Sequence, residues 1–284
     1  MDAIGLRFDD VAELYDRVRP RYPAELFDDL ATLTGIRPGA TVLEVGCGPG
    51  QATRGLLDRG WRVHAVEPGP AMAARARENF AGRPFAVDVT RFDDWDSAGA
   101  SFPVLFSATA YHWVAPQVRW TKAAAVLAAD GAIALATNRT VAGGQFDEVY
   151  RASEDLHRRY GPEIDFGLPQ TARSITDEID AARHDIGAVW AGADPKSGPS
   201  LAGPLFTPPE IRYYEWEVSY DTAGAAALLS TYSPYLRVPP ERRTPLLDGI
   251  ADIVETDFGG TVTRRYLGVL AVAKRGGPEE DRPL

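Results

Sequence analysis

The sequence has a single cysteine, Cys47, among its 284 residues. One thiol cannot form an internal disulfide, so the chain suits a reducing compartment, and we expect a cytoplasmic protein. Long apolar runs are also missing, since no uninterrupted stretch approaches the roughly 20 residues needed to span a bilayer. The sequence does not begin with a charged and then apolar segment, so we expect neither a secretory signal nor a membrane partner.

Positive charge is scarce as well. The chain carries 30 Lys and Arg against 40 Asp and Glu, a net charge of −10, and has no Lys/Arg-rich block. Neutralising phosphates requires a basic face, so we expect no nucleic-acid partner. The apolar fraction of 45% is sufficient for a sizeable core, and the length fits one large α/β domain with an insertion.

A glycine-rich turn follows a short apolar segment near the N-terminal third of the chain. Residues 41–53 read Thr-Val-Leu-Glu-Val-Gly-Cys-Gly-Pro-Gly-Gln-Ala-Thr. Glycine is needed where the backbone takes a positive φ or where a ligand approaches the main chain closely. The pattern predicts a strand, a turn at Gly46, Gly48 and Gly50, and a helix that begins at Gln51. Such a turn suits a nucleotide-type ligand, although a tight turn that binds nothing remains the alternative.

Acidic residues end the next two expected strands. Residues 61–67 form an apolar-rich strand that ends in Glu67, seventeen residues after Gly50. An acid near this spacing accepts the ribose hydroxyls in βαβ nucleotide folds. Residues 84–89 predict a third strand, which ends near Asp88. Glu67 could instead be a solvated loop residue.

The glycine spacing separates two cofactor classes. Gly46-x-Gly48-x-Gly50 is tighter than the Gly-x-Gly-x-x-Gly fingerprint of dinucleotide sites. Together with Glu44, it resembles the Glu-x-Gly-x-Gly-x-Gly motif of class I S-adenosylmethionine (SAM) methyltransferases, and is similar to small-molecule enzymes of the trans-aconitate type. The resemblance is strongest over residues 8–138. It implies SAM as the cofactor and a Rossmann-like α/β fold, with a seven-stranded, mostly parallel sheet between helices.

The resemblance also implies the cofactor contacts. Asp88 would accept the adenine amino group beside the backbone N–H of Val89, and Met72 would touch the ring or simply be a core methionine. An N-terminal helical segment would form a lid, with Tyr15 and Arg21 toward the cofactor carboxylate. The complete predicted set is Tyr15, Arg21, Glu44, Gly46, Cys47, Gly48, Gln51, Glu67, Pro68, Met72, Asp88, Val89 and Ser107.

A continuous apolar strand at 103–110 runs into Tyr111-His112-Trp113 at the expected ligand edge of the sheet. His112 can accept a proton at neutral pH and is the candidate general base; a histidine that only shapes the pocket is the alternative. A carboxylate substrate would need a cation such as Arg139 instead. The predicted substrate contacts are Tyr111, Trp113, Arg139, Tyr232 and Tyr235.

We expect lid helices at 1–35, a SAM-binding core at 36–142, a helical cap insertion at 143–206, terminal strands with further cap helices at 207–275 and a disordered tail at 276–284. An oligomer contact, such as a homodimer interface, is the alternative role of the insertion. The predicted activity is methyl transfer to an oxygen or carbon nucleophile of a small molecule. The alternatives are a SAM-binding protein without methyl transfer (a cyclase or regulatory module), an NAD-dependent dehydrogenase, and a protein or RNA methyltransferase, which the acidic charge disfavours.

Overall fold

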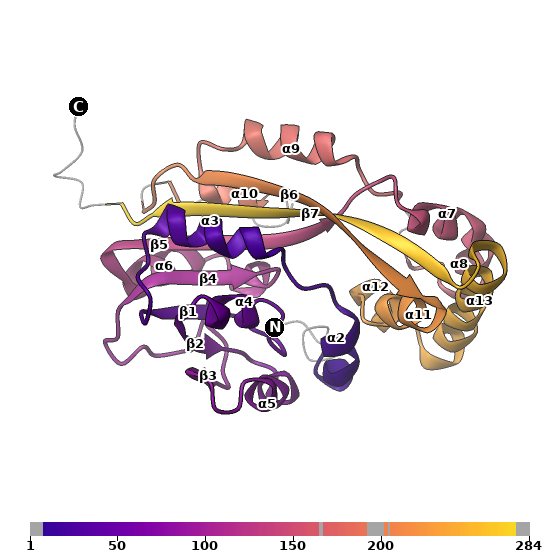
Figure 1. Ribbon diagram of the computed structural model, residues 1–284, viewed down its shortest axis with the longest axis horizontal. Coiled ribbons are helices and arrows are strands. Elements are labelled where there is room, and N and C mark those ends of the chain that lie inside the picture. Colours follow the sequence, from indigo (N-terminus) through magenta and orange to yellow (C-terminus); the bar gives the residue numbers. More distant parts are fainter. Residues whose placement is uncertain (1–7, 165–166, 192–201, 204, 277–284) are drawn as a thin grey trace. The chain divides into compact units, whose positions relative to one another are not determined.

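The computed structural model describes residues 8–164, 167–191, 202–203 and 205–276. In this part of the chain, seven strands form one sheet in the order β3-β2-β1-β4-β5-β7-β6 (Figure 1). The strands are β1 (Thr41–Val45), β2 (Arg62–Val66), β3 (Phe85–Asp88), β4 (Phe102–Ala108), β5 (Leu127–Thr140), β6 (Glu210–Asp221) and β7 (Thr261–Lys274). The predicted Rossmann-like fold is therefore confirmed.

Strands β3, β2, β1, β4 and β5 pair in parallel. The chain builds outward from β1 in two directions, first through β2 to β3 and then through β4 to β5. In such sheets, ligands bind beyond the carboxyl ends of the strands at the point where the order reverses, here between β1 and β4. The register between β4 and β5 shifts between Phe102 and Val104, at Pro103.

The described residues also form helices and two short 3-10 turns. They are α2 (Ala12–Val18), α3 (Ala24–Thr34), α4 (Thr53–Asp58), α5 (Pro70–Asn79), α6 (Arg119–Val126), α7 (Gln145–Ala152), α8 (Glu154–Tyr160), α9 (Ala172–Ala181), α10 (Ile186–Ala191), α11 (Thr222–Ser230), α12 (Ser233–Arg237) and α13 (Pro240–Phe258), with the 3-10 turns η1 (Asp9–Val11) and η2 (Tyr111–Trp113). Helix α4 begins at Thr53 and not at Gln51, because the turn continues through residues 49–52. Helix α12 begins at Ser233, since Pro234 in a first helical turn needs no N–H donor.

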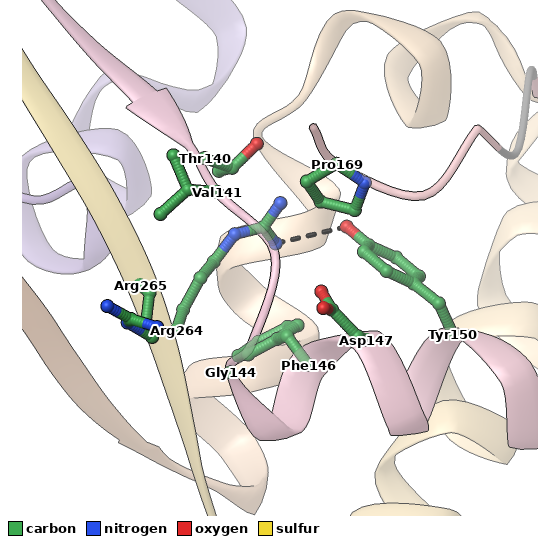
Figure 2. A pocket seen from close by; sticks show the side chains of 9 residues that line it. All are labelled: Thr140, Val141, Gly144, Phe146, Asp147, Tyr150, Pro169, Arg264 and Arg265. Carbon is green, nitrogen blue, oxygen red and sulfur yellow. Dashed lines mark hydrogen bonds between the residues drawn. The ribbon is translucent and has the colours of Figure 1, made fainter. Parts of the chain in front are cut away.

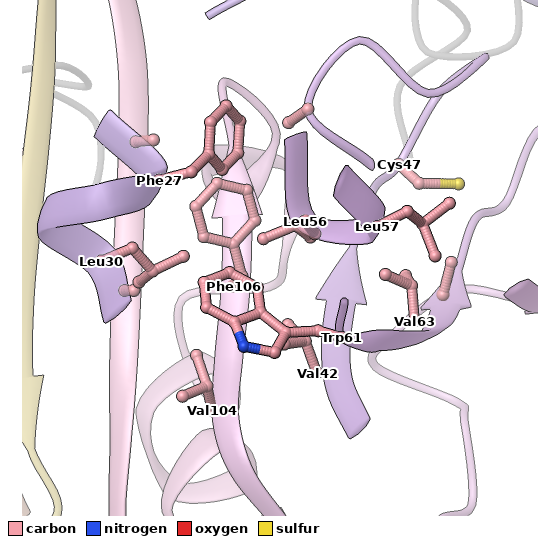
Figure 3. Packing of buried hydrophobic residues seen from close by; sticks show 14 of the residues in the cluster. Phe27, Leu30, Val42, Cys47, Leu56, Leu57, Trp61, Val63, Val104 and Phe106 are labelled. Carbon is pink, nitrogen blue, oxygen red and sulfur yellow. The ribbon is translucent and has the colours of Figure 1, made fainter. Parts of the chain in front are cut away.

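Alternate residues of the central strands enter two separate cores. Val104 and Phe106 pack with helices α3, α4 and α5, whereas Leu105 packs with α6 and α10 on the opposite face. Figure 3 shows the first core, in which Phe106 and Trp61 lie among aliphatic side chains of the strands and helices. Burial on both faces explains why 103–110 reads as a continuous apolar run.

The chain divides into two compact units. Unit 1 comprises Met1–Pro20, Arg139–Ser174 and Glu215–Leu267, and unit 2 comprises Arg21–Asn138, Ile175–Tyr214 and Gly268–Leu284. Unit 2 holds the two cores that flank the strands, and unit 1 has its own core, built by apolar residues of α2, α7, α11 and α13.

The insertion expected as a single cap at 143–206 is divided between these units. Helices α7 and α8 belong to unit 1, and α10 belongs to unit 2 because Ile186 and Trp190 are buried in one of its cores. Residues 192–201 of the insertion lie outside the described part of the chain, as do residues 277–284 of the expected tail.

Candidate functional site

The three glycines of the turn after β1 differ in the space that surrounds them. All three have a positive φ: +73° at Gly46, +54° at Gly48 and +107° at Gly50. A Cβ at Gly46 would lie 2.5 Å from the Cβ of Ala110, and one at Gly50 would lie 2.2 Å from the ring of Phe80. A Cβ at Gly48 would meet no atom within 4 Å. Gly46 and Gly50 are thus required by packing, whereas Gly48 faces open space where a ligand can approach the backbone.

Glu67 holds this turn from the end of β2. Its Oε2 accepts the backbone N–H of Gly48 at 2.9 Å, and its Oε1 accepts that of Gly69 at 2.9 Å. The side chain is buried, so these charge-assisted bonds fix the carboxylate beside the open face of Gly48. This is the place that the sequence predicted for an acceptor of ribose hydroxyls.

Glu44 lies inside the fold. It is 1% exposed, and its Oε2 accepts the hydroxyl of Thr53 in α4 at 2.6 Å. Burial raises the pKa of Glu44 to about 8; the Thr53 bond opposes this and the charge of Glu67 adds to it. The predicted cofactor contact at Glu44 is therefore a buried link between β1 and α4, because its carboxyl does not reach the surface of the turn.

Replacing Glu44 with glutamine tests this burial. The folded protein holds a proton that the unfolded chain releases above its pKa of 4.5, so stability falls as the pH rises from about 5 to 8. The Glu44→Gln variant keeps an acceptor for Thr53 and loses this dependence, so it should gain on the order of 2 kcal/mol relative to the wild type over that range. Urea unfolding at several pH values, with the exposed Glu25→Gln as control, measures the difference; parallel curves would contradict it.

Asp88 is the last residue of β3, and its two carboxylate oxygens differ in their hydrogen bonding. Its Oδ2 binds His64 Nε2 at 2.8 Å and Trp95 Nε1 at 2.7 Å, and these bonds, His64 first, lower the pKa of the carboxyl. Its Oδ1 accepts no hydrogen bond from the described residues. The neighbouring Val89 is 43% exposed although it is large and apolar. An oriented acceptor beside an apolar surface suits the amino edge and face of a purine. The sequence did not predict the supporting roles of His64 and Trp95.

Three other predicted cofactor residues are buried near the turn. Ser107 donates to the carbonyl of Val45 at 2.7 Å and links β4 to β1. Burial, with the nearby charges of Glu67 and Glu44, raises the pKa of the Cys47 thiol, which keeps it protonated and unreactive. Met72 is 4% exposed in α5, which favours the core alternative. Gln51 and Pro68 are half-buried at the ends of the turn and of β2, respectively.

A strained residue marks the end of β4. Thr109 has a φ of +54°, which is unusual for a β-branched residue, and its hydroxyl shares a hydrogen bond of 2.7 Å with that of Tyr22. Ala110, the next residue, is the one that closes on Gly46. Such strain concentrates at functional sites, and no local sequence signal predicted it here.

The ring-bearing residues that follow Thr109 differ in their burial. Tyr111 is fully buried, and its hydroxyl donates to the carbonyl of Arg119 at 2.6 Å. The prediction of Tyr111 as a substrate contact is corrected: it is a core residue in contact with Trp120. His112 and Trp113 are half-buried, with ring centroids 4.8 Å apart.

The remaining predicted contacts are distributed over both units. Arg21, in unit 2, is exposed, and its carbonyl accepts the amide of Asn138 at 2.9 Å. In unit 1, Tyr15 lies 4.8 Å from the guanidinium of Arg19, and Arg139 bonds Gln170 at 3.4 Å.

The two predicted tyrosines of unit 1 differ in exposure. The ring of Tyr232 faces the guanidinium of Arg19 at 4.1 Å. Tyr235 is 3% exposed and bonds the buried His157 at 2.8 Å, so its predicted place on a pocket wall is corrected to a place in the core of unit 1.

Comparison with known proteins finds relatives of the region that contains the first strands and the glycine-rich turn. Residues 42–131 match the methyltransferase domain family. An uncharacterized methyltransferase of Mycobacterium tuberculosis is 32% identical over 139 residues, which are 48% of this chain and 53% of the relative. One of Geobacillus kaustophilus is 33% identical over 87 residues, 28% of this chain and 40% of the relative. The chain thus spans about half, or less, of the length of these curated relatives.

A solved structure described as a type II methyltransferase from Anaeromyxobacter dehalogenans extends the likeness to the fold. It matches with a TM-score of 0.60 and covers 90% of this chain and 97% of its own, at 24% identity. That likeness establishes the architecture. None of the helices in the described residues is both long and apolar enough to cross a membrane. The described residues also contain no group of three His, Cys, Asp or Glu side chains that could hold a metal ion.

Proposed function

We propose that this chain transfers a methyl group from SAM to an oxygen or carbon nucleophile of a small molecule. The observation that carries the proposal is the open face of Gly48, with the carboxylate of Glu67 fixed beside it at the end of β2. Asp88 and the exposed Val89 lie at the end of the adjacent β3. The match of residues 42–131 to a methyltransferase domain supports the same assignment.

The residues present fit the chemical parts of SAM. Glu67 offers a carboxylate to a ribose diol, and Asp88 Oδ1 with the apolar side chain of Val89 offers an acceptor and a surface to adenine. Gly48 leaves space at the main chain, where a ligand can approach the backbone. Titration calorimetry tests the assignment: S-adenosylhomocysteine should bind and NAD should not, and the opposite result would replace the proposal with a dehydrogenase.

When bound, SAM supplies a methyl group that its sulfonium already activates, so the protein's own task is alignment and the exclusion of water. The turn and the acids at the ends of β2 and β3 hold the donor in one orientation. His112 stands three residues beyond the strained Thr109, at the end of the β4 segment that closes on the turn. An alcohol or carbon acid needs a base to remove its proton, and we assign that role to His112. The acceptor class follows the resemblance to small-molecule enzymes of the trans-aconitate type.

The His112→Gln variant tests the proton transfer. We expect its affinity for S-adenosylhomocysteine to stay within about 2-fold of the wild type, because the imidazole is assigned to the acceptor and not to the donor. The rate of methyl transfer should fall by roughly 10²-fold or more, with loss of the acidic limb of the pH profile. Single-turnover transfer from methyl-labelled SAM to a panel of phenols, alcohols and carbon acids measures it. The exposed His184→Gln serves as control, and equal rates in all three proteins would exclude His112 as the base.

A further inference from the structure

The acid at the end of β3 is tied to the strand beside it. In the parallel pair of β2 and β3, Val66 lies opposite Asp88 and His64 lies opposite Ala86. Side chains alternate between the two faces of a strand, so His64 and Asp88 lie on the same face of the sheet as diagonal neighbours. This register explains how Nε2 of His64 reaches Oδ2 of Asp88 at 2.8 Å.

Aromatic packing fixes both groups that hold the Asp88 carboxylate. Trp95 is 7% exposed, and its Nε1 donates to the same Oδ2 at 2.7 Å. The ring centroid of His64 lies 5.6 Å from that of Trp95 and 6.0 Å from that of Phe102. The hydrogen bonds, that of His64 first, lower the pKa of the Asp88 carboxyl, so at neutral pH it is ionised and can only accept.

The second oxygen of Asp88, Oδ1, is left as an oriented acceptor. No described residue donates to it, and the Asp88 side chain is 50% exposed. An aspartate at such an exposed position can normally rotate and turn either oxygen toward water. Here the rotation would break two charge-assisted hydrogen bonds at Oδ2. Oδ1 therefore keeps its direction, and a ligand group that meets it must bring a donor.

We propose that His64 and Trp95 make this site selective for adenine over a 6-oxo purine, by fixing the acceptor that the base meets. The inference rests on the proposed function, in which Asp88 faces the base of SAM. The amino group of adenine donates to Oδ1, whereas the 6-oxygen of hypoxanthine would place a second acceptor against a carboxylate that is held in place. Neither His64 nor Trp95 touches a reacting atom, so both are positioning residues that act through Asp88.

Asp147, an acid of unit 1, provides a matched control for the carboxylate itself. It is 8% exposed, and its Oδ2 accepts the backbone N–H of Gly143 at 2.8 Å. Figure 2 shows it on α7 with Tyr150, whose hydroxyl accepts an Nη–H of Arg264 at 3.0 Å. Because Asp147 is buried and binds its own loop, Asp147→Asn should leave the choice between bases unchanged, whereas Asp88→Asn should remove it.

Two ligands that differ at the base test the proposal, S-adenosylhomocysteine and its 6-oxo analogue S-inosylhomocysteine. Each is titrated by calorimetry into the full-length protein at neutral pH. The wild type should bind the adenine compound at least ~20-fold more tightly, because the 6-oxo compound leaves the acceptor unpaired. His64→Met and Trp95→Phe each remove one donor and keep most of the apolar volume, so each should reduce this preference at least ~3-fold. The double variant should prefer adenine by less than ~3-fold.

Two further variants separate hydrogen bonding from packing. His64→Gln keeps an N–H donor near the position of Nε2, so its preference should stay within about 2-fold of the wild type. Phe102→Leu disturbs the packing beside both rings and keeps both donors, so it should lower stability and leave the preference intact. An equal loss of preference in Phe102→Leu and His64→Met would overturn the inference, as would an unchanged preference in the double variant. Failure of the wild type to bind S-adenosylhomocysteine would overturn the proposed function as well.

Discussion

The Gly48→Ala variant is expected to lose binding of S-adenosylhomocysteine by roughly 30-fold or more, equivalent to about 2 kcal/mol. Its Cβ would enter the open space beside the Glu67 carboxylate, where the proposed ligand approaches the main chain. A non-glycine residue at this positive φ also strains the backbone by about 1–2 kcal/mol. Affinity and strain must therefore be measured separately.

The chain offers a matched control in Gly60, between α4 and β2. Its φ is +76°, and a Cβ there would also meet no atom within 4 Å. Gly60→Ala should lose a similar amount of stability and keep the wild-type affinity. Calorimetry with S-adenosylhomocysteine and urea unfolding of both variants give the two quantities. Equal affinities in Gly48→Ala and Gly60→Ala would show that the turn does not contact the ligand.

The Phe106→Ala variant is expected to lower the free energy of unfolding by about 3–5 kcal/mol. Phe106 is fully buried in the central strand β4, and its ring centroid lies 6.3 Å from that of Phe27 in α3. Removing the ring leaves a cavity between a sheet and a helix that both have regular backbones, so the site collapses only partly. Such a loss is a large part of the stability of an ordinary domain.

Urea unfolding measures this effect, with Leu168→Ala as the control. Leu168 is 49% exposed, so its truncation should change the free energy of unfolding by less than about 0.5 kcal/mol. If the two variants were equally stable, Phe106 would not be part of a close-packed core. A Phe106→Leu variant, which keeps most of the apolar volume, should fall between them.

Local patterns predicted the fold well where the relevant signal is itself local. Helix α13 spans Pro240–Phe258, within the region expected to hold further helices; proline suits its first turn, and Gly259, with a φ of +66°, ends it. The run at 103–110 reads as a strand buried on both faces, and the glycines at 46–50 mark the turn. Each of these signals depends on the backbone within a few residues.

The directions of side chains and their contact partners were harder to predict from the sequence. Tyr111 was expected to contact the substrate, but its buried ring contacts Trp120 of α6 and Trp190 of α10. Glu44 is buried because it shares the α4 side of β1 and finds Thr53 there. The sequence contains the acid and the tyrosine, but their directions depend on how the neighbouring helices pack against the sheet.

The division of the chain has a consequence for engineering. Unit 1 is assembled from Met1–Pro20, Arg139–Ser174 and Glu215–Leu267, and unit 2 from the intervening and C-terminal segments. Each of the strands β5, β6 and β7 contributes residues to both units. A chimera that exchanges unit 1 for that of another protein therefore needs splice points within three β-strands, and truncation at a single position cannot isolate either unit.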